Sequence, residues 1–453
     1  MGRLPLIVIV IALVATLPLA RGRTFPLSAA VRYALRHSSA QALARARQAQ
    51  ARAALRAAQS EGSVRATASY GYLFSDNPLL ALSAELERRQ VSAQAFTPST
   101  LNSPGVRRLG TASLSLAWPL YEGGAIHDAV RAGRFAKQAA GRAGARTRQR
   151  IVATVVTAYE GLVMAKAGVR VARGAVAVAA RHAHTTRRLY ARGRILHSDA
   201  LTAAVNLGAA REFLLGAQND VANARTDLAL AMGAPAGLAI HIPAQTFGPV
   251  AMPRRPLRQL LRVALRHRAD VAALRAKIRA LRAQGAAARG RSSLHVTLTA
   301  QSQWFSRVPT FRHNAWTVGA VISKSLYDGG HNGDRAAELE ARAAETEAAL
   351  TGLEDRIRRS VVTAYDALYN AAQRLILARA TVQRARRNVA LVQVLYGEGR
   401  TILLNLLNAD QGLVKAREDE LAARYALARN RAALADACGT LSPATLPALG
   451  LKP

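Results

Sequence analysis

The stretch Leu120–Tyr121–Glu122–Gly123–Gly124 decides the fold, because the chain repeats it as Leu326–Tyr327–Asp328–Gly329–Gly330. Tyr327 follows Tyr121 by 206 residues, and other segments recur at the same spacing. Self-similarity at a fixed spacing is the sequence signature of a duplicated architecture. The 453-residue chain is therefore predicted to consist of two copies of one structural unit.

Further matches extend the duplication. Val155–Tyr159 recurs identically as Val361–Tyr365, and Gly233 matches Gly439. Two short motifs of the form Leu-Tyr-x-x-Gly-Arg also match, Leu189, Tyr190, Gly193 and Arg194 in the first copy and Leu395, Tyr396, Gly399 and Arg400 in the second. Nearer the start of each copy, Ala34–His37 recurs 230 residues later as Ala264–His267. The larger spacing predicts an insertion in the first copy, between about Tyr72 and Gly110.

Proline marks the boundaries between the copies. None occurs between Pro119 and Pro235 or between Pro309 and Pro443, whereas five lie from Pro235 to Pro256. Proline ends helices, so long proline-free stretches rich in Ala, Arg and Leu predict very long helices. The predicted parts are a first repeat at 21–233, a proline-rich linker at 234–256, a second repeat at 257–441 and a C-terminal tail at 442–453.

The N-terminus has the order of charges and apolar residues found in exported proteins. Arg3 precedes the apolar run Leu6–Leu17, and Ala20 is a small residue suited to cleavage. The run is too short for a membrane span, so residues 1–20 are predicted to be a secretory signal peptide. The single cysteine, Cys438, can form no intramolecular disulfide and is interpreted as a small buried residue at a helix end.

The charge narrows the function classes without choosing among them. A formal net charge of +36 suits a nucleic-acid binder, a membrane-surface protein or a solvated periplasmic protein. An enzyme has the least support, since the sequence holds no His-Glu-x-x-His spacing, serine elbow, phosphate loop or paired His/Cys ligand set. We therefore predict no catalytic residue, no cofactor and no metal site.

The proline-free stretches carry coiled-coil spacing. In the second copy, apolar residues recur at alternating steps of three and four from Val362 to Tyr396, with arginines between them. A helix from Gly330 to about Leu395 would be roughly 100 Å long. Periodicity alone would favour a plain antiparallel coiled coil with no channel, since most such stripes are simply helix-packing seams.

Segments of period two precede each double-glycine motif. Ala112–Trp118 and Trp316–Ser323 alternate, and so do their upstream partners Ala68–Phe74 and Val296–Trp304. All four are apolar on one face and small or polar on the other, as membrane strands are. They predict β-hairpins at about 66–120 and 293–327, with an aromatic girdle formed by the three tryptophans, Trp118, Trp304 and Trp316.

Four strands cannot close a barrel, and lipid tolerates no open sheet edge. Membrane strands would therefore require several chains to share one sheet, and three copies would supply twelve strands. Two soluble amphipathic hairpins that cover a core share the same alternation and remain an alternative. The strand-to-helix turns are predicted at the glycine pairs, where the backbone needs torsions that other residues avoid: Gly123, Gly124, Gly329 and Gly330.

The duplicated order of these motifs resembles the TolC-type outer-membrane efflux protein family, from about Leu27 to Leu441. The resemblance implies a mainly α fold with a small antiparallel transmembrane β part. A homotrimer would complete a 12-stranded β-barrel in the outer membrane of a Gram-negative bacterium and a long α-helical barrel in the periplasm. It also implies docking onto a periplasmic adaptor and an inner-membrane pump. The chain would be a passive duct of a tripartite efflux or type I secretion system for small molecules, metal ions or polypeptides.

The resemblance also assigns the helix-hairpin turns to a periplasmic tip, where the tunnel narrows and the adaptor docks. The implied docking residues are Leu189, Tyr190, Gly193, Arg194 and Ile195 in the first turn, and Leu395, Tyr396, Gly399, Arg400 and Thr401 in the second. Family members often carry acidic residues beyond each turn. Asp199 fits that pattern, whereas Asn405 and Asn408 stand in the second copy.

Two hypotheses follow for the aperture. Hydrogen bonds and ion pairs among Arg194, Arg400 and Asp199 would hold a resting tip, and adaptor binding would shift the balance. The arginine excess would make the lumen less cation-selective than an acidic-ringed duct.

Two other function classes stay open at this point. A soluble periplasmic coiled-coil adaptor would also be exported, but it would need a single hairpin. A basic coiled coil that binds nucleic acid would fit the charge, but export would remove it from cytoplasmic DNA. The two-faced strands favour the duct, with outer-membrane lipid and no nucleic acid as its surroundings.

Overall fold

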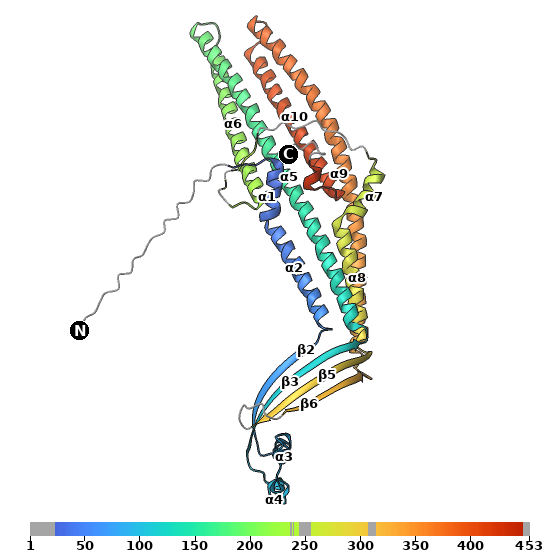
Figure 1. Cartoon of the computed structure of the whole chain (residues 1–453). Helices are drawn as coiled ribbons and strands as arrows, with labels where there is room; N and C mark the ends of the chain where they lie inside the picture. Colours follow the sequence, from blue (N-terminus) through green and yellow to red (C-terminus); the bar gives the residue numbers. More distant parts are fainter. Residues whose placement is uncertain (1–22, 236–237, 239, 244–254, 307–313, 447–453) are drawn as a thin grey trace, which may run out of the picture. The chain divides into compact units, whose positions relative to one another are not determined.

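The computed structural model describes residues 23–235, 238, 240–243, 255–306 and 314–446 (Figure 1). The signal peptide expected at residues 1–20, most of the proline-rich linker and the end of the C-terminal tail lie outside these residues. The chain divides into two compact units, and each unit takes segments from both sequence copies. The helical unit comprises the described parts of 1–44, 144–269 and 354–453, and the sheet unit comprises those of 45–143 and 270–353.

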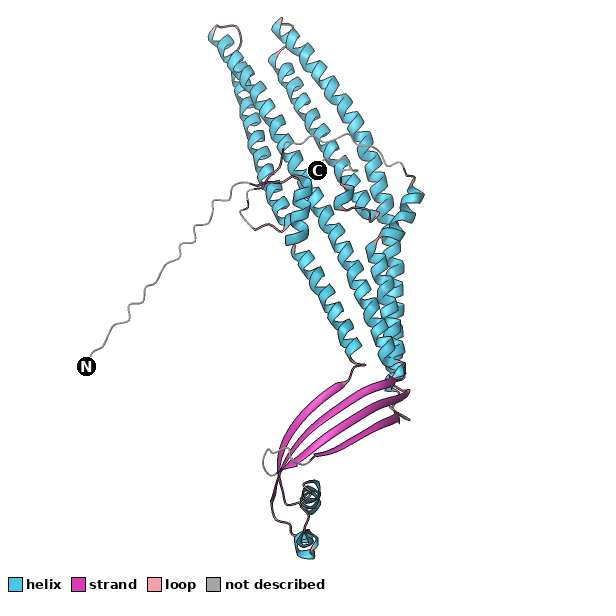
Figure 2. Ribbon diagram, viewed as in Figure 1, coloured by secondary structure: helices cyan, strands magenta, loops and turns pink. Residues whose placement is uncertain are grey.

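The sheet unit contains a four-stranded antiparallel sheet (Figure 2). Its strands are β2 (Arg65–Ser75), β3 (Arg107–Glu122), β5 (Leu294–Ser306) and β6 (Asn314–Lys324). The order β2-β3-β5-β6 places one hairpin from each copy side by side, joined through β3 and β5. Among the described residues, β2 and β6 are each paired along one edge only.

The strand register aligns the predicted faces across the whole sheet. Residues directly opposite each other in paired strands lie on the same face, because side chains alternate along each strand. The apolar face has the pairs Ala68 with Leu114, Leu116 with Ala300, and Ala300 with Val318. Ser302, opposite Leu114 and Trp316, is a polar exception on this face.

The other face carries hydroxyl and amide side chains in the same way. Ser69 and Ser113 are opposite each other and their hydroxyl oxygens lie 2.7 Å apart. Ser113 is in turn opposite Gln303, and Gln301 is opposite Thr317. The alternation in the sequence therefore becomes one mainly apolar face and one mainly polar face, with Phe305 and Val321 as apolar residues on the polar face.

The insertion of the first copy forms a small helical segment between β2 and β3. It contains α3 (Pro78–Glu87), the 3-10 helix η1 (Ala93–Phe96) and α4 (Pro98–Asn102). Asn77 caps α3, with its Oδ1 accepting from the N–H of Leu79 at 2.9 Å. The buried Arg88 donates from Nη2 to the carbonyl of Arg108 at 3.0 Å, which ties the insertion to β3.

Long helices carry most of the chain. They are α5 (Ala125–Ala191) and α6 (His197–Met232) in the first copy, and α9 (His331–Gly397) and α10 (Leu403–Ala437) in the second. Each of α5 and α9 has 67 residues, about 100 Å at 1.5 Å per residue. Shorter helices precede the strands: α1 (Leu27–His37) and α2 (Ser39–Ser60), then α7 (Leu257–His267) and α8 (Ala269–Gly290).

The main core lies in the helical unit. Tyr159, Leu162, Leu228 and Met232 are fully buried there, where α5 and α6 pack against α1. A short parallel pairing of β1 (Arg23–Thr24) with β4 (Ile240–His241) closes one side, and the 3-10 helix η2 (Pro443–Thr445) follows α10. The hydroxyl of Tyr159 donates to the carbonyl of Phe25 at 3.3 Å, so its only polar atom is satisfied in the core.

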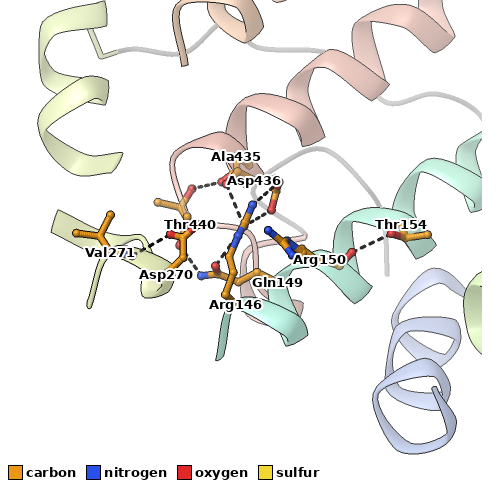
Figure 3. Close-up of polar contacts among 10 residues, drawn as sticks. Arg146, Gln149, Arg150, Thr154, Asp270, Val271, Ala435, Asp436 and Thr440 are labelled. Carbon is orange, nitrogen blue, oxygen red and sulfur yellow. Dashed lines mark hydrogen bonds and ion pairs between the residues drawn. The ribbon is translucent and has the colours of Figure 1, made fainter. Parts of the chain in front are cut away.

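A buried ion pair joins the two copies inside the helical unit (Figure 3). Arg146 on α5 contacts Asp436 on α10 through two atoms of its guanidinium, at 2.5 Å and 3.0 Å. Gln149, one turn further along α5, donates to the carbonyl of Gly439 at 2.8 Å. The bidentate geometry makes this a directional link as well as an electrostatic one.

The fold is mostly helical with a small antiparallel sheet, as predicted. Among the described residues, no helix is both long enough and apolar enough to cross a membrane.

Candidate functional site

The first strand exit is a crowded turn from β3 into α5. Gly123 has φ +60° and Gly124 has φ +82°, torsions that residues with a Cβ rarely adopt. A Cβ on Gly123 would lie 2.2 Å from the carbonyl oxygen of Gly290 and 2.5 Å from Cβ of Ser293. Glycine at 123 is therefore required twice, by its torsion and by the close approach of the chain at the end of α8.

The second exit has the same torsions and a different partner. Gly329 and Gly330 have φ +68° and +84°, but nothing lies within 4 Å of a Cβ built on Gly329. Asp328 stabilises this turn, since its carboxylate accepts from the N–H of Gly330 at 3.0 Å and from the N–H of Asn332 at 3.2 Å. The hydrogen bond from the backbone of Asn332 has the largest effect on the pKa of Asp328 and lowers it, and the hydrogen bond from Gly330 lowers it further.

The first hairpin turn joins α5 to α6 and closes with two backbone hydrogen bonds. The N–H of Gly193 donates to the carbonyl of Tyr190 at 2.8 Å, and the N–H of Arg194 donates to that of Leu189 at 2.9 Å. Gly193 has φ +67°. This is the glycine-terminated helix ending in which left-handed torsion satisfies the last carbonyls.

The second hairpin turn, between α9 and α10, closes in the same way. Gly399 has φ +72° and donates to Tyr396 at 3.1 Å, while Arg400 donates to Leu395 at 2.8 Å. The two matching motifs therefore have a structural role in ending a helix. That role accounts for the glycines, while the side chains of Arg194 and Arg400 are exposed at the turns.

The two hairpins pack against each other near their turns. A small buried cluster joins them, consisting of Ala183, Ala203, Leu403 and Leu407, with Leu207 and Tyr396 partly buried at its edge. Tyr190 lies at the first turn in ring contact with His197, with centroids 4.6 Å apart. Tyr396 therefore packs between hairpins, whereas Tyr190 is 43% exposed.

Polar contacts between the helices, a few residues away from the turns, also connect the hairpins. His182 Nε2 on α5 lies 2.8 Å from Asp410 Oδ2 on α10, with side chains only 16% and 15% exposed. Gln411 donates to Asn206 on α6 at 3.1 Å. A pocket of about 230 Å³ adjoins these residues between α5, α6 and α10, with Phe213 in its apolar lining.

The structure shows only some of the interactions predicted for the aperture residues. Burial raises the pKa of Tyr396, and the negative charge of Asp199 raises it further. Arg400 Nη1 lies 3.4 Å from Glu398, on its own turn. The ion-pair network among Arg194, Arg400 and Asp199 stays a prediction for the assembled protein.

The remaining tip residues are exposed or make local contacts. Asn405 donates from its side chain to the hydroxyl of Thr401 at 2.9 Å, which stabilises the start of α10. Asn408 is exposed one turn further along, and Ile195 is partly buried in the first turn. The second copy therefore has asparagines, and not carboxylates, at positions 405 and 408.

The three tryptophans and the aromatic residues of β2 lie on the uncovered apolar face of the sheet. Trp118 is 44% exposed and Trp316 is 74% exposed. Trp304 and Trp316 lie near the turn between β5 and β6, whereas Trp118 lies toward the strand exits. Tyr70, Tyr72 and Phe74 follow one another on the same face of β2, also exposed.

Sequence reasoning missed the polar residues that link the copies. At the spacing of 206, His182 corresponds to Asn388 and Asp410 to Ala204. Comparison of the copies therefore selects shared turns and overlooks contacts that one copy alone supplies. No group of three or more His, Cys, Asp or Glu within the described residues is placed to hold a metal ion. Burial raises the pKa of the Cys438 thiol to about 11, which makes it a poor nucleophile.

Comparison with known proteins gives the family. The model of the outer membrane efflux protein family matches residues 34–234 and 260–440, which together cover most of the chain. The chain belongs to the outer membrane efflux protein family. The two matched segments correspond closely to the two sequence copies. Members of this family are outer-membrane efflux channels and not enzymes.

Solved structures of outer-membrane channels share the fold. VceC from Vibrio cholerae is 22% identical with a TM-score of 0.74, over 91% of this chain and 96% of that one. CmeC from Campylobacter jejuni is 16% identical with a TM-score of 0.78, over 94% and 89%. The open state of MtrE from Neisseria gonorrhoeae is 17% identical with a TM-score of 0.73, over 92% and 90%. No curated protein sequence matches the chain significantly.

Proposed function

We propose that this efflux-family chain is the outer-membrane subunit of a tripartite efflux or type I secretion system. Three copies would share one 12-stranded β-barrel in the outer membrane and one helical tunnel in the periplasm. The tunnel would dock through its hairpin tips onto a periplasmic adaptor and an inner-membrane pump. The duct would be passive, since no catalytic group is expected in it.

The sheet carries this proposal. Its apolar face is exposed from β2 to β6, with Phe74 63% and Ile322 67% exposed, so hydrocarbon would be its natural surroundings. The opposite face carries serine, threonine and glutamine, which suits water. The unpaired sides of β2 and β6 require partners in a membrane, because lipid supplies no hydrogen bonds to backbone groups. Identical chains that pair β6 with β2 would satisfy both edges.

The decisive experiment places one charge on each face of the same strand. Thr317 and Val318 are neighbours on β6, both exposed, and their side chains point to opposite faces. We expect Val318→Lys to abolish stable insertion in the outer membrane, because a lysine facing lipid costs about 2–4 kcal/mol per chain at mid-depth. Thr317→Lys, which would face water, should still insert.

The readout is outer-membrane fractionation with a heat-modifiable oligomer on a gel, followed by single-channel conductance in a planar bilayer. Thr317→Lys should retain the oligomer and reduce the preference for cations. Equal tolerance of both substitutions, or a wild-type chain that remains monomeric without detergent, would contradict the proposal.

A further inference from the structure

The two hairpin tips have the same backbone and very different charge. From residue 181 to 199, the first tip has five arginines and one acid: Arg181, Arg187, Arg188, Arg192, Arg194 and Asp199. The matching window of the second tip, residues 387 to 405, has two arginines, Arg387 and Arg400, and one acid, Glu398. Opposite Arg187, Arg188 and Arg192, the second tip has Gln393, Val394 and Glu398. The high charge of the whole chain therefore does not explain the first tip, since the second copy shares that background.

The arginines of the first tip are exposed and unpaired. All five have exposed side chains, and within the described residues no acidic side chain lies within 4 Å of any of their guanidinium nitrogens. Some exposed arginines elsewhere on the long helices have acidic neighbours. Arg342 lies 2.6 Å from Glu338, and Arg358 lies 2.5 Å from Asp355. The first tip is thus a place where the fold leaves cationic side chains without carboxylates.

The spacing of these arginines gives the patch a shape. Arg181 and Arg188 are seven residues, or two helical turns, apart on α5, so they lie along one side of the helix, and Arg192 follows in the turn directly after it. Carboxylates two helical turns apart on a second helix would meet Arg181 and Arg188 side by side, as charged residues do along a coiled-coil seam. A guanidinium also binds a carboxylate through two parallel hydrogen bonds.

The first tip also exposes apolar side chains. Leu196, in the turn, is 72% exposed, and Tyr190 is 43% exposed. Arginine and tyrosine side chains around an apolar centre are characteristic of protein–protein interfaces. A membrane surface would instead favour a helix with one flat apolar face, which the arginine-bearing end of α5 lacks.

We propose that the first-copy tip, and not the second, is a basic docking surface for an acidic α-helix of the periplasmic adaptor. The inference rests on the proposed function, in which the tips meet an adaptor. It adds the chemistry of that partner, namely carboxylates two helical turns apart that would face Arg181 and Arg188, with a further carboxylate near Arg192 in the turn. It also predicts an alternating charge pattern around the end of the trimer, in which basic first tips and near-neutral second tips follow one another.

The test exchanges the side chains of one tip for those of the other. The variant Arg187→Gln/Arg188→Val/Arg192→Glu gives the first tip the residues of the second, which the same backbone turn already accommodates. The probe is a synthetic helical peptide with glutamates at positions 1, 8 and 12. The full-length oligomer in detergent is titrated with this peptide at physiological salt, and a peptide with glutamine at those positions serves as its neutral counterpart.

A matched control separates the patch from net charge. Arg47→Gln/Arg52→Gln/Arg56→Glu removes the same total charge from exposed positions on α2. We expect the tip exchange to weaken binding of the acidic peptide about tenfold or more, as several exposed ion pairs together would, and the α2 control to weaken it less than about twofold. The reverse exchange, Gln393→Arg/Val394→Arg/Glu398→Arg, should strengthen binding.

Each other outcome has a definite meaning. Equal losses in the tip exchange and the α2 control would overturn the proposal, because binding would then follow net charge. Loss of binding to phosphatidylglycerol vesicles without loss of peptide binding would overturn it in favour of a lipid partner. The tip exchange should still insert in the membrane and form channels. A wild-type chain that forms no channel would contradict the proposed function. The difference in binding between the glutamate and glutamine peptides would still test the chemistry of the tip.

Discussion

The two copies of the chain keep their turns and differ in their contacts. Both have the double glycine at the strand exit, the glycine that ends each hairpin helix and the glycine after each return helix, Gly233 and Gly439. By contrast, the side chains that connect the elements have no equivalent partners at the matching positions of the other copy. Arg146 and Asp436 form a buried ion pair, while their counterparts at the spacing of 206 are Gly352 and the exposed Leu230.

The difference teaches which positions the duplicated backbone requires and which positions have specialised. A turn needs the same torsion in either copy, so its glycine is kept. Side chains face different neighbours in the two copies, so they are free to diverge into links, packing or docking surfaces. Substitution of matched residues in the two copies therefore separates torsional requirements from contact requirements.

The largest difference is expected at the strand exits. Gly123→Ala should strongly destabilise the fold, because its Cβ would collide with the carbonyl oxygen of Gly290 and with Ser293. Gly329→Ala should cost only the torsional penalty, about 1–2 kcal/mol, because no atom lies within 4 Å of its Cβ. Thermal unfolding of the detergent-solubilised protein measures both. Gly168→Ala, at an open helical position, is the control and should be neutral or slightly stabilising.

Equal losses at the two exits would show that the torsion alone matters. The crowding at Gly123 would then have no energetic consequence, and the comparison between copies would fail at this position.

The second prediction concerns the ion pair between the copies. Arg146→Met should lower the free energy of unfolding by about 3 kcal/mol, since it leaves Asp436 largely buried without its partner. Arg148→Met changes an exposed arginine of the same helix and should have little effect. Arg146→Lys should recover only part of the loss, because an ammonium cannot replace the bidentate fork. Similar midpoints of urea unfolding for Arg146→Met and Arg148→Met would refute the assignment.

The third prediction compares two carboxyls at matching positions. Glu160 is 3% exposed and neither carboxyl oxygen has a hydrogen-bond partner within the described residues, whereas its counterpart Asp366 is exposed. Burial raises the pKa of Glu160 to about 8, although the positive charge of Arg431 on α10 lowers it. The hydroxyl of Tyr425 also lies nearby on that helix.

The sign of the pH dependence follows from this shift. Because the folded-state pKa lies above the unfolded value of about 4.5, the folded protein binds the proton more tightly. The contribution to stability is complete below pH 4.5 and is lost as the pH rises through about 8. Glu160→Gln should therefore be more stable than wild type at pH 9 and similar to it at pH 5. Melting curves between these pH values test this, with Asp366→Asn as a control that keeps the wild-type slope.

The sequence predicted those parts of the fold that depend on local patterns. The alternation at Ala112–Trp118 lies within β3, and the coiled-coil spacing from Val362 to Tyr396 lies within α9. Both patterns come from a single apolar face on each element, so the sequence of this one chain was sufficient to predict them. The insertion was located from a difference in spacing, but its helices α3 and α4 were not predicted, because they are short and their apolar residues have no clear period.

The candidate site was predictable only where it is duplicated. Gly193 and Gly399 were found because the same turn occurs twice. The link between His182 and Asp410 was not found, because nothing in either helix alone indicates that the two side chains meet. The asymmetry of charge between the tips was present in the sequence, but it gained meaning once the structure showed the first-tip arginines exposed and unpaired.

The smallest effect is expected at the aperture, where single polar interactions are worth only about 0.2–1 kcal/mol each. If the predicted network among Arg194, Arg400 and Asp199 holds the resting tip, Asp199→Ala and Arg400→Ala should each raise the open probability of single channels by a few-fold. Asn405→Ala changes the matching residue of the second copy and should leave gating close to wild type. Asn405→Asp restores the missing acid and should increase cation preference, read as the reversal potential in a salt gradient. Unchanged gating in both Asp199→Ala and Arg400→Ala would show that the resting tip is held by the packing of Leu403 and Leu407 and by the link from His182 to Asp410, and not by charges at the turn.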